Sequence, residues 1–247
     1  MTGTVTAMAE AALCRLLTWL SPGYPLGAFS YSHGLEHAVE AGLVRDAAGL
    51  VRDAAGLEAY AAAALAHGAA RVDAALLAAA WEAAQRGDLA ALEDLADLGV
   101  AWRGSTELGL ESAAQGDAFP RTTCAAWPHP LLGALAARRQ APGAPTPTPL
   151  PVALGAAAAA AAHGVPIAPA ATAFLHAFAA NLVSAGVRLV PLGQTEGQRV
   201  LAALEGLVHA TAAEAGSTPL DEVGTAAPII DWCSMRHETQ HTRLFRS

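Results

Sequence analysis

Apolar residues recur at three- and four-residue intervals along most of the chain, which is the spacing of one buried helix face. The segment 71–86 is the clearest example, and Gly87 follows it as a helix stop signal. Its apolar face is formed by Val72, Leu76, Ala79, Ala80 and Ala83. The same spacing predicts further helices over residues 7–20, 30–42, 57–67, 88–98, 106–118, 152–163, 170–190 and 195–213. We therefore expect an all-α protein, a single-domain bundle of roughly eight to ten helices.

Residues with capping chemistry set the expected helix starts. Ser30 is a predicted N-cap for a helix that ends at Gly42, and Asp88 is the predicted N-cap of a short acidic helix. Thr195 and Gln198 have the S/T-x-x-Q spacing of a capping box, which predicts the start of the last long helix.

Two irregular stretches interrupt the helical pattern. The run RRQAPGAPTPTPLP at 138–151 contains too much proline for a helix interior, so we predict an exposed loop within one domain covering 1–247. The heptapeptide GLVRDAA occurs at 42–48 and again at 49–55. A single duplication of this length favours a local insertion, because solenoids need several repeats of ~20–50 residues.

Composition strengthens the all-α prediction and excludes two classes of enzyme. Alanine supplies much of the 53% of hydrophobic residues, whereas aromatic residues make up 5%, which favours helix over sheet. All 14 basic residues are arginine, so the chain lacks the lysine of P-loop nucleotidases and Schiff-base enzymes. The formal net charge of −8 disfavours nonspecific binding to nucleic acid and favours protein partners.

The cysteines and the most apolar segment indicate a reduced, cytoplasmic protein. Cys14, Cys124 and Cys233 are far apart and show no C-x-x-C spacing, so we expect them to be small core residues. Residues 174–192 include His176, an asparagine and an arginine, which a membrane span rarely tolerates, so a buried core helix is predicted. His176 is expected to be a hydrogen-bonded core residue. The N-terminus has no basic region of a secretory signal, and no membrane association is expected.

The sequence HETQH at 237–241 matches H-E-x-x-H, in which two histidines one helical turn apart hold zinc and a glutamate activates water. Such a site needs a third ligand, and no His, Asp or Glu follows His241. We therefore predict no catalytic residue and no metal site, with His237 and His241 as weak candidates for adventitious zinc or nickel. A zinc metallopeptidase centred on His237, Glu238 and His241 is kept as an alternative hypothesis.

The C-terminal segment 234–247 combines large apolar side chains with arginines on a chain that is acidic overall. Large apolar side chains such as Met235, Leu244 and Phe245 are not expected in a solvent-exposed helix. Apolar anchors flanked by arginines are typical of a docking segment. We predict that this tail folds onto the body of the protein or onto a partner.

A second group of polar residues lies near the N-terminus. His33, Glu36, His37 and Glu40 follow the i, i+3, i+4, i+7 spacing, so one helix face would carry four potential ligands. We interpret this face as solvated, with contact to a partner and a metal site as the alternatives.

Three long stretches resemble the UreF family of urease accessory proteins. They read SPGYPLGAFSYSHGLEHAVEAGLV at 21–44, AFAANLVSAGVRLVPLGQTEGQRVLAAL at 177–204 and PIIDWCSMRHETQHTRLFRS at 228–247. The resemblance implies an all-α protein without catalytic activity that dimerises and binds the accessory protein UreD, also called UreH. Together they would recruit the GTPase UreG to the urease apoprotein for nickel insertion.

The resemblance also implies that the complex handles nickel and that no cofactor is bound tightly to this chain. In the family the C-terminal segment orders when the UreD-type partner binds, so a mobile partner-docking tail is expected at 234–247. The implied partner-binding residues are Tyr31, Glu36, Met235, Arg236, His237, Glu238, Thr239, Gln240, Thr242, Arg243, Leu244, Phe245 and Arg246. An α-helical adaptor without a connection to nickel is a further alternative.

Three histidines depart from the family pattern. His241 stands where an aromatic residue is usual, so the H-E-x-x-H match arises from one substitution. His33 and His37 stand where we expect glutamine and a tryptophan-like residue, which weakens a metal role shared by the family.

Overall fold

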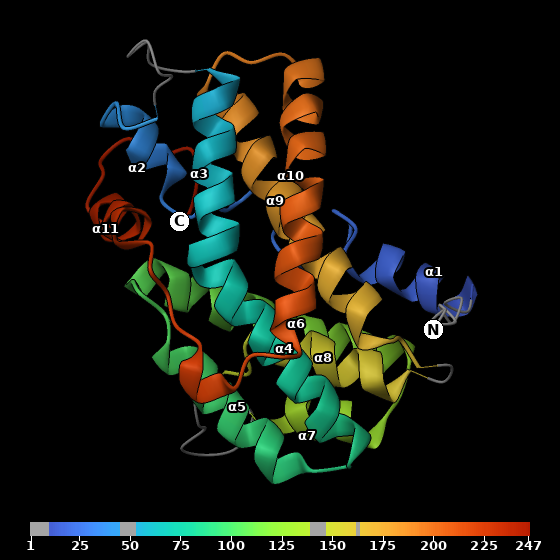
Figure 1. Ribbon diagram of the computed structural model, residues 1–247. Coiled ribbons are helices and arrows are strands. Elements are labelled where there is room, and N and C mark those ends of the chain that lie inside the picture. The colour runs from blue at the N-terminus through green and yellow to red at the C-terminus, as the bar shows by residue number, and fades with distance from the viewer. Residues whose placement is uncertain (1–9, 45–52, 139–146, 162–163) are drawn as a thin grey trace.

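Every regular element in the described residues is helical, which confirms the all-α prediction (Figure 1). The structure is a computed structural model that describes residues 10–44, 53–138, 147–161 and 164–247. Within these ranges the eleven α-helices are α1 (Glu10–Trp19), α2 (Leu35–Glu40), α3 (Ala54–His67), α4 (Ala69–Gln85), α5 (Leu89–Ala101), α6 (Thr106–Ala126), α7 (Pro130–Arg138), α8 (Leu150–Ala160), α9 (Ile167–Leu189), α10 (Gln194–Ala215) and α11 (Pro228–His237). A 3-10 turn covers Leu220–Glu222.

Helices α4 and α8 form the centre of the bundle and pack against each other more extensively than any other pair of described helices. Their backbones approach closely at Gly155, where an added Cβ would lie 2.3 Å from the carbonyl oxygen of Leu77. Leu76, Leu77 and Leu154 are fully buried at this contact, and each stabilises the fold by about 2 kcal/mol. Small residues in both helices therefore allow the close approach.

The other helices cover α4 and α8 from two sides. Helices α3, α9 and α10 pack on α4 and on one another, while α5, α6 and α7 surround the α8 end of the bundle. Figure 1 shows α1 and the N-terminus on one side, and α2, α11 and the C-terminus together on the other. Segments from opposite ends of the sequence therefore meet beside α3.

The first predicted cap is wrong, because the chain before α2 is a tight loop rather than a helix. Gly27, Phe29, His33 and Gly34 all have positive φ, between 51° and 77°, a region that a right-handed helix does not use. Helix α2 consequently covers only six residues and starts after Gly34.

Of the other two predicted caps, Asp88 is confirmed and the capping box at Thr195 is wrong. Asp88 caps α5 as expected, since its Oδ1 accepts a hydrogen bond from the Ala91 N–H at 3.0 Å. Helix α10 instead starts after Gly193, whose N–H donates to Glu196 Oε2 at 2.9 Å, so Thr195 and Gln198 do not form the predicted capping box. Helix α6 continues beyond the predicted end through Pro120, and α7 was not predicted.

Two predicted irregular features fall largely outside the described residues. These are positions 45–52 of the GLVRDAA duplication and positions 139–146 of the proline-rich stretch. At its flanks, α7 ends at Arg138 and α8 begins at Leu150, so residues 150–151 belong to a helix rather than to the expected loop.

Two helical stretches among the described residues are long and apolar enough, by length and composition alone, to cross a membrane. One joins α3 and α4 over residues 54–85, and the other is α9. Their most apolar windows are 67% and 56% buried inside the protein, which agrees with the prediction that residues 174–192 form a core helix. A core helix passes the same test, so this signal is weak.

Side chains predicted to fill the core are only partly where we expected them. Cys233 is fully buried, and burial raises the pKa of its thiol to about 11. Cys124 is half-buried, whereas Cys14 is exposed on the outer face of α1. His176 is also exposed, so the prediction of a buried, hydrogen-bonded histidine is wrong.

Candidate docking site of the C-terminal tail

The C-terminal tail, residues 238–247, lies folded against the body of the protein next to α2 and α6 (Figure 1). It follows α11 and ends with Ser247, which is 1% exposed. In the single chain the tail is therefore docked through specific contacts, although the family resemblance led us to expect a mobile segment.

Three buried glutamates receive the tail, and we call Glu36, Glu107 and Glu111 the carboxylate cluster. Each is 7% exposed. Glu36 comes from α2, and the other two lie one helical turn apart on α6, so that they share a face. Buried carboxylates need charged or hydrogen-bonding partners, and the tail supplies most of them.

The Glu36 side chain holds the tail by accepting hydrogen bonds from the tail's backbone. Its Oε1 accepts a hydrogen bond from the Leu244 N–H at 2.6 Å, and its Oε2 accepts one from the Phe245 N–H at 2.9 Å. Oε2 also lies 3.0 Å from His237 Nε2. Such charge-assisted hydrogen bonds are roughly twice as strong as neutral ones.

Glu107 binds two side chains of the C-terminal segment. His237 Nδ1 lies 2.6 Å from Glu107 Oε2, and Arg243 Nη1 lies 2.6 Å from Glu107 Oε1. His237 is completely buried and thus bridges Glu36 and Glu107. Both ring nitrogens of His237 thus have a carboxylate partner.

Serines fix the two ends of the docked segment. The Ser247 carbonyl accepts hydrogen bonds from the Ser32 N–H at 2.5 Å and from Ser32 Oγ at 2.6 Å, while Ser247 Oγ donates to Glu111 Oε2 at 2.9 Å. At the other end, the Ser234 and Ser105 hydroxyls lie 2.6 Å apart.

Arg188 of α9 also holds the tail, and sequence reasoning missed it. Its guanidinium lies 4.3 Å from the centre of the buried Phe245 ring and donates to the Phe29 carbonyl at 2.9 Å. A cation over an aromatic ring is a favourable contact. Arg188 follows an apolar helical run, where its sequence neighbours give no sign of a tail contact.

The H-E-x-x-H residues do not adopt the arrangement of a zinc peptidase. Helix α11 ends at His237, so the exposed His241 does not share a helix face with it. Glu238 Oε1 accepts from the Thr106 N–H at 2.8 Å, so this carboxylate caps α6. Across the described ranges, no three His, Cys, Asp or Glu side chains are grouped to hold a metal ion.

The predicted face of four polar residues is divided by the fold. His33 precedes α2 in the tight loop, and Glu36 points into the carboxylate cluster, so the prediction of a solvated face is wrong for Glu36. Glu40 is exposed, and the ring of His37 packs edge-on against Trp232 of α11 at 5.3 Å.

The predicted partner-binding residues separate into an inner and an outer set. Glu36, His237 and Phe245 are buried and anchor the tail, while Tyr31, Glu238 and Gln240 are half-buried. Burial and the nearby Glu111 raise the pKa of the Tyr31 phenol. The exposed outer set consists of Met235, Arg236, Thr239, Thr242, Arg243, Leu244 and Arg246.

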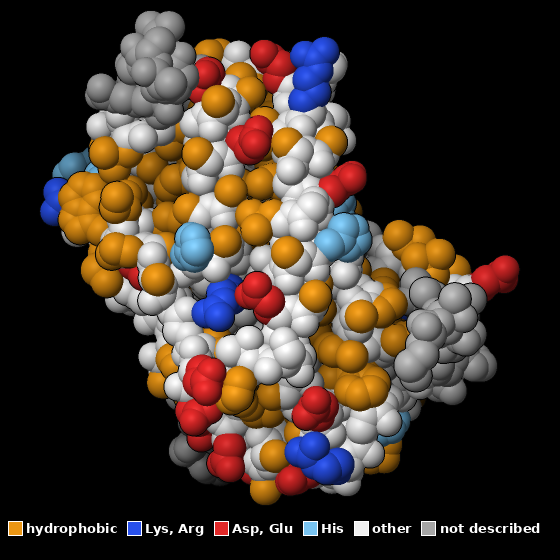
Figure 2. All heavy atoms as spheres, in the orientation of Figure 1, with side chains coloured by type: hydrophobic (Ala, Val, Ile, Leu, Met, Phe, Trp, Pro, Cys, Tyr) orange, Lys and Arg blue, Asp and Glu red, His pale blue; other side chains and the backbone are white. Residues whose placement is uncertain are grey.

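An apolar stripe on α11 continues this outer set. Ile229, Trp232 and Met235 follow one another at three-residue spacing and are 65%, 48% and 49% exposed, and Leu244 is 62% exposed. Figure 2 shows hydrophobic side chains gathered at the edge of the molecule where Figure 1 places α11. We call Ile229, Trp232, Met235 and Leu244 the α11 stripe. Exposed apolar side chains grouped in this way mark interaction surfaces.

A groove of about 1020 Å³ lies between α1, α9 and α10, none of which belongs to α11 or to the tail. Its walls are mostly apolar, and Leu13 and Leu17 of α1 remain 46% and 65% exposed beside it. Its polar lining residues include His176, Glu205 and His209. The groove is a second candidate interface.

Comparison with known proteins finds relatives that match nearly the whole length of this chain. A family model named UreF matches residues 51–205. A urease accessory protein UreF from Granulibacter bethesdensis is 50% identical over 98% of this chain and 97% of its own length. The corresponding protein of Bradyrhizobium diazoefficiens is 46% identical over 99% of this chain and 96% of its own length.

The chain belongs to the UreF family. A further UreF, from Rhodopseudomonas palustris, is 48% identical over 99% of this chain and 97% of its own length. The similarity includes the docked tail and α2, which lie outside the matched range of the family model. UreF membership supports a role in urease maturation, and it confirms the resemblance seen in the sequence.

Proposed function

We propose that this chain is a non-catalytic scaffold for urease maturation, which binds a UreD-type accessory protein through the α11 stripe and the outer set of the tail. The observation that carries the proposal is the docked tail, because the carboxylate cluster fixes the backbone of residues 244 and 245. Leu244 and the neighbouring arginines are exposed, and the tail that carries them follows directly on α11. The surface offers apolar anchors with charged neighbours, which is the usual make-up of a protein interface.

The wider assembly follows from the family. The complex with the UreD-type protein would recruit the UreG GTPase to the urease apoprotein, where nickel is inserted. The absence of lysine supports a partner that supplies the nucleotide chemistry. In this proposal the complex handles nickel in the cytoplasm, and the chain holds no tightly bound cofactor.

We also propose that two copies of the chain associate through the groove between α1, α9 and α10. A two-fold interface is self-complementary, and the groove has suitable features: projecting leucines beside an apolar cleft, and a glutamate with two histidines as possible hydrogen-bonding partners. In a two-fold pair, Leu13 and Leu17 of one copy would enter the cleft of the other. Glu205 would then face His176 or His209 of the second copy.

A binding experiment with the UreD-type partner tests the docking surface. The double variant Met235→Glu, Leu244→Glu places charges on the surface without touching the carboxylate cluster, so we expect at least roughly tenfold weaker binding in a pull-down or titration. Leu17→Glu, which changes an exposed leucine in the groove, is the matched control and should bind the partner like the wild type. Equal binding by the double variant and the wild type would overturn the proposed surface.

One further variant distinguishes the peptidase hypothesis from the scaffold proposal. Glu238→Gln would abolish proteolysis if HETQH were catalytic, whereas the scaffold proposal expects no proteolysis by the wild type against a casein substrate. Binding of neither UreD-type nor UreG-type protein would favour the adaptor hypothesis.

A further inference from the structure

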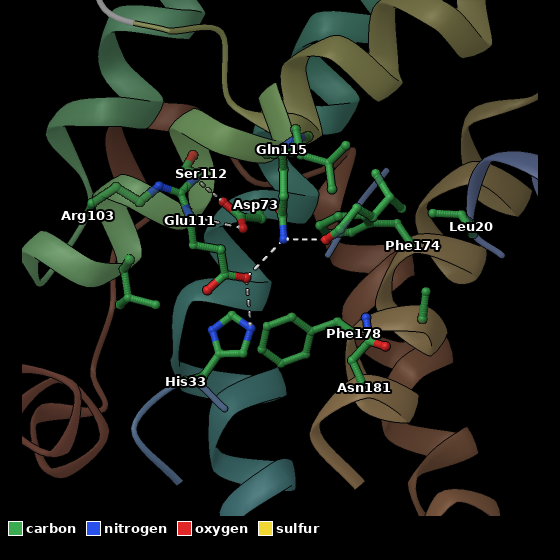
Figure 3. Close-up of a pocket in the computed structure, with 15 residues that line it drawn as sticks. Leu20, His33, Asp73, Arg103, Glu111, Ser112, Gln115, Phe174, Phe178 and Asn181 are labelled. Carbon is green, nitrogen blue, oxygen red and sulfur yellow. Dashed lines mark hydrogen bonds and ion pairs between the residues drawn. The ribbon is translucent and has the colours of Figure 1, made fainter. Parts of the chain in front are cut away.

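A small cavity of about 70 Å³, with both polar and apolar walls, lies beside the carboxylate cluster, between α4, α6, α9 and the loop before α2 (Figure 3). His33, Glu111 and Asn181 line it, together with the hydroxyl-bearing Ser112. The volume exceeds the ~10–15 Å³ needed for one water molecule, so a small hydrated ion fits. The cavity does not contribute to the docking surface described above.

The buried charges around this cavity are unbalanced in the described part of the chain. Four carboxylates, Glu36, Asp73, Glu107 and Glu111, are each 7–8% exposed. Two arginines pair with them: Arg103 forms two hydrogen bonds with Asp73, and Arg243 binds Glu107. His237 contacts both Glu36 and Glu107 through its two ring nitrogens.

Glu111 is the carboxylate without a permanent cationic partner among the described residues. Its hydrogen bonds come from Gln115 Nε2 at 3.0 Å and Ser247 Oγ at 2.9 Å, both neutral. It forms an ion pair with His33, whose Nε2 lies 3.6 Å from Glu111 Oε1. Burying an ionised carboxylate without a compensating charge is costly, so this position favours a cation.

Arg103 forms its direct ion pair with Asp73 and not with Glu111. Burial lowers the pKa of its guanidinium, but the charge and hydrogen bonds of Asp73 and the more distant charge of Glu111 raise it by more, so Arg103 remains a cation. Figure 3 shows Glu111 between the Arg103–Asp73 pair and the His33 ring, with its carboxylate facing His33.

The groups that face Glu111 have the chemistry of metal ligands. Imidazole and carboxylate together suit divalent cations such as nickel and zinc. Ser112 is 5% exposed and lines the same cavity, and its Oγ has no hydrogen-bond partner among the described residues. The Asn181 amide and water molecules can complete a coordination shell.

The His33 ring is held in place for such a contact. It packs in a tilted orientation against Phe178, with ring centroids 4.7 Å apart, and the His33 backbone carbonyl accepts a hydrogen bond from the Tyr60 hydroxyl at 2.9 Å. Burial raises the pKa of that phenol well above its usual value, so Tyr60 remains a donor. His33 has φ of 51°, and this backbone directs the residue away from the α2 helix face.

We propose that His33 and Glu111 bind a divalent first-row cation in this cavity. With two strong protein ligands and no third His, Cys, Asp or Glu grouped with them in the described ranges, the site is weak and exchanges its ion readily. Identification of the ion as nickel rests on the proposed function, whereas the site itself rests on the unbalanced charge of Glu111.

Nickel titration of the tag-free, metal-stripped full-length chain by calorimetry tests the site. His33→Asn removes the imidazole but tolerates the left-handed backbone, because asparagine adopts that conformation readily. We expect at least roughly tenfold weaker binding at this site than in the wild type. His241→Asn, which removes an exposed histidine of the tail, is the matched control and should leave the affinity unchanged.

A second variant and a second readout keep the result unambiguous. Glu111→Gln removes the charge at similar size and should weaken nickel binding as well, while paramagnetic Co²⁺ should broaden the NMR signals of the adjacent Phe178 ring. Indistinguishable titrations of the wild type and His33→Asn, or the absence of saturable binding, would overturn the proposal. The titration uses the chain alone, so a negative result would contradict the proposed metal site without bearing on the partner-binding proposal, which the pull-down tests.

Discussion

The role of His237 is set by its surroundings in the fold and not by its sequence motif. In the sequence it opens an apparent zinc motif, but in the fold both ring nitrogens face carboxylate oxygens, at 2.6 Å and 3.0 Å. The imidazole ring therefore links α2 and α6 to α11. Removal of one partner from such a buried pair is costlier than the pair's net contribution, because it leaves an unpaired charge.

Substitution of Glu36 by glutamine tests this network at the residue scale. The new side chain would present an NH₂ group where Leu244 and Phe245 now donate, and His237 would lose one of its two charged partners. We expect the free energy of unfolding to fall by about 3 kcal/mol. Urea denaturation measures this loss, and hydrogen exchange at amides 244 and 245 should become much faster.

Glu40→Gln is the matched control for this change. Glu40 lies on the same short helix but is exposed, so its substitution should change the stability by less than about 0.5 kcal/mol. Unchanged amide protection in Glu36→Gln would show that the carboxylate does not hold the tail.

At the scale of elements, the meeting of the loop before α2 with α11 depends on one glycine. Gly34 has φ of 77°, and a Cβ added there would lie 2.6 Å from the Ser234 nitrogen and 2.9 Å from the Cys233 carbonyl carbon. These are backbone atoms of α11, which cannot move aside as a flexible side chain does. The glycine thus allows both the turn and the close approach.

Gly34→Ala separates these two effects when it is compared with Gly87→Ala. Gly87 also has positive φ, at 67°, but no atom of the described residues lies within 4 Å of its added Cβ. We expect Gly87→Ala to cost about 1 kcal/mol for the backbone alone. Gly34→Ala should cost about 2 kcal/mol more, because α11 is displaced.

The comparison is made by urea denaturation of both variants. A similar loss of stability in the two proteins would show that the approach of α11 to Gly34 contributes little.

The sequence predicted the long helices well and the short connections poorly. Helices such as α4 and α9 carry their apolar spacing over many residues, so their existence was clear, and the Asp88 cap was recognisable from its chemistry. The loop before α2 was misread because Phe29 and His33 adopt positive φ, which is uncommon for residues other than glycine and which the local sequence pattern does not predict.

The candidate site was predicted in part. The tail residues were found through composition and family resemblance, whereas the roles of Glu107 and Glu111 were missed because they lie in an ordinary amphipathic helix pattern. Their partners His237 and Ser247 are 130 and 136 residues away in sequence, respectively. Local periodicity carries no information about pairs at that distance.

On the scale of the whole molecule, the two candidate interfaces are built from different elements. The α11 stripe and the tail form one, and the groove of α1, α9 and α10 forms the other. In Figure 1, α1 and α11 lie on opposite sides of the bundle. A scaffold built in this way can bind a second copy on one side and a different protein on the other.

Leu17→Glu tests the groove as the contact between copies. A charge in place of a 65% exposed leucine should leave the fold intact but prevent burial of this face, so we expect a shift from dimer to monomer. Light scattering coupled to size-exclusion chromatography measures the mass in solution. Met235→Glu, on the opposite side, should leave it unchanged, and a wild type that is monomeric at all concentrations would contradict the proposed contact.

The docked tail also has a consequence for the time course of folding. Its hydrogen bonds with Glu36 and Ser32 join residues separated by 208 to 215 positions. Closing so long a loop is slow compared with forming the local α-helical turns. Docking of the tail should therefore be a late step, and until it occurs Glu36, Glu107 and Glu111 face water with the N-terminus of α6 not yet capped by Glu238.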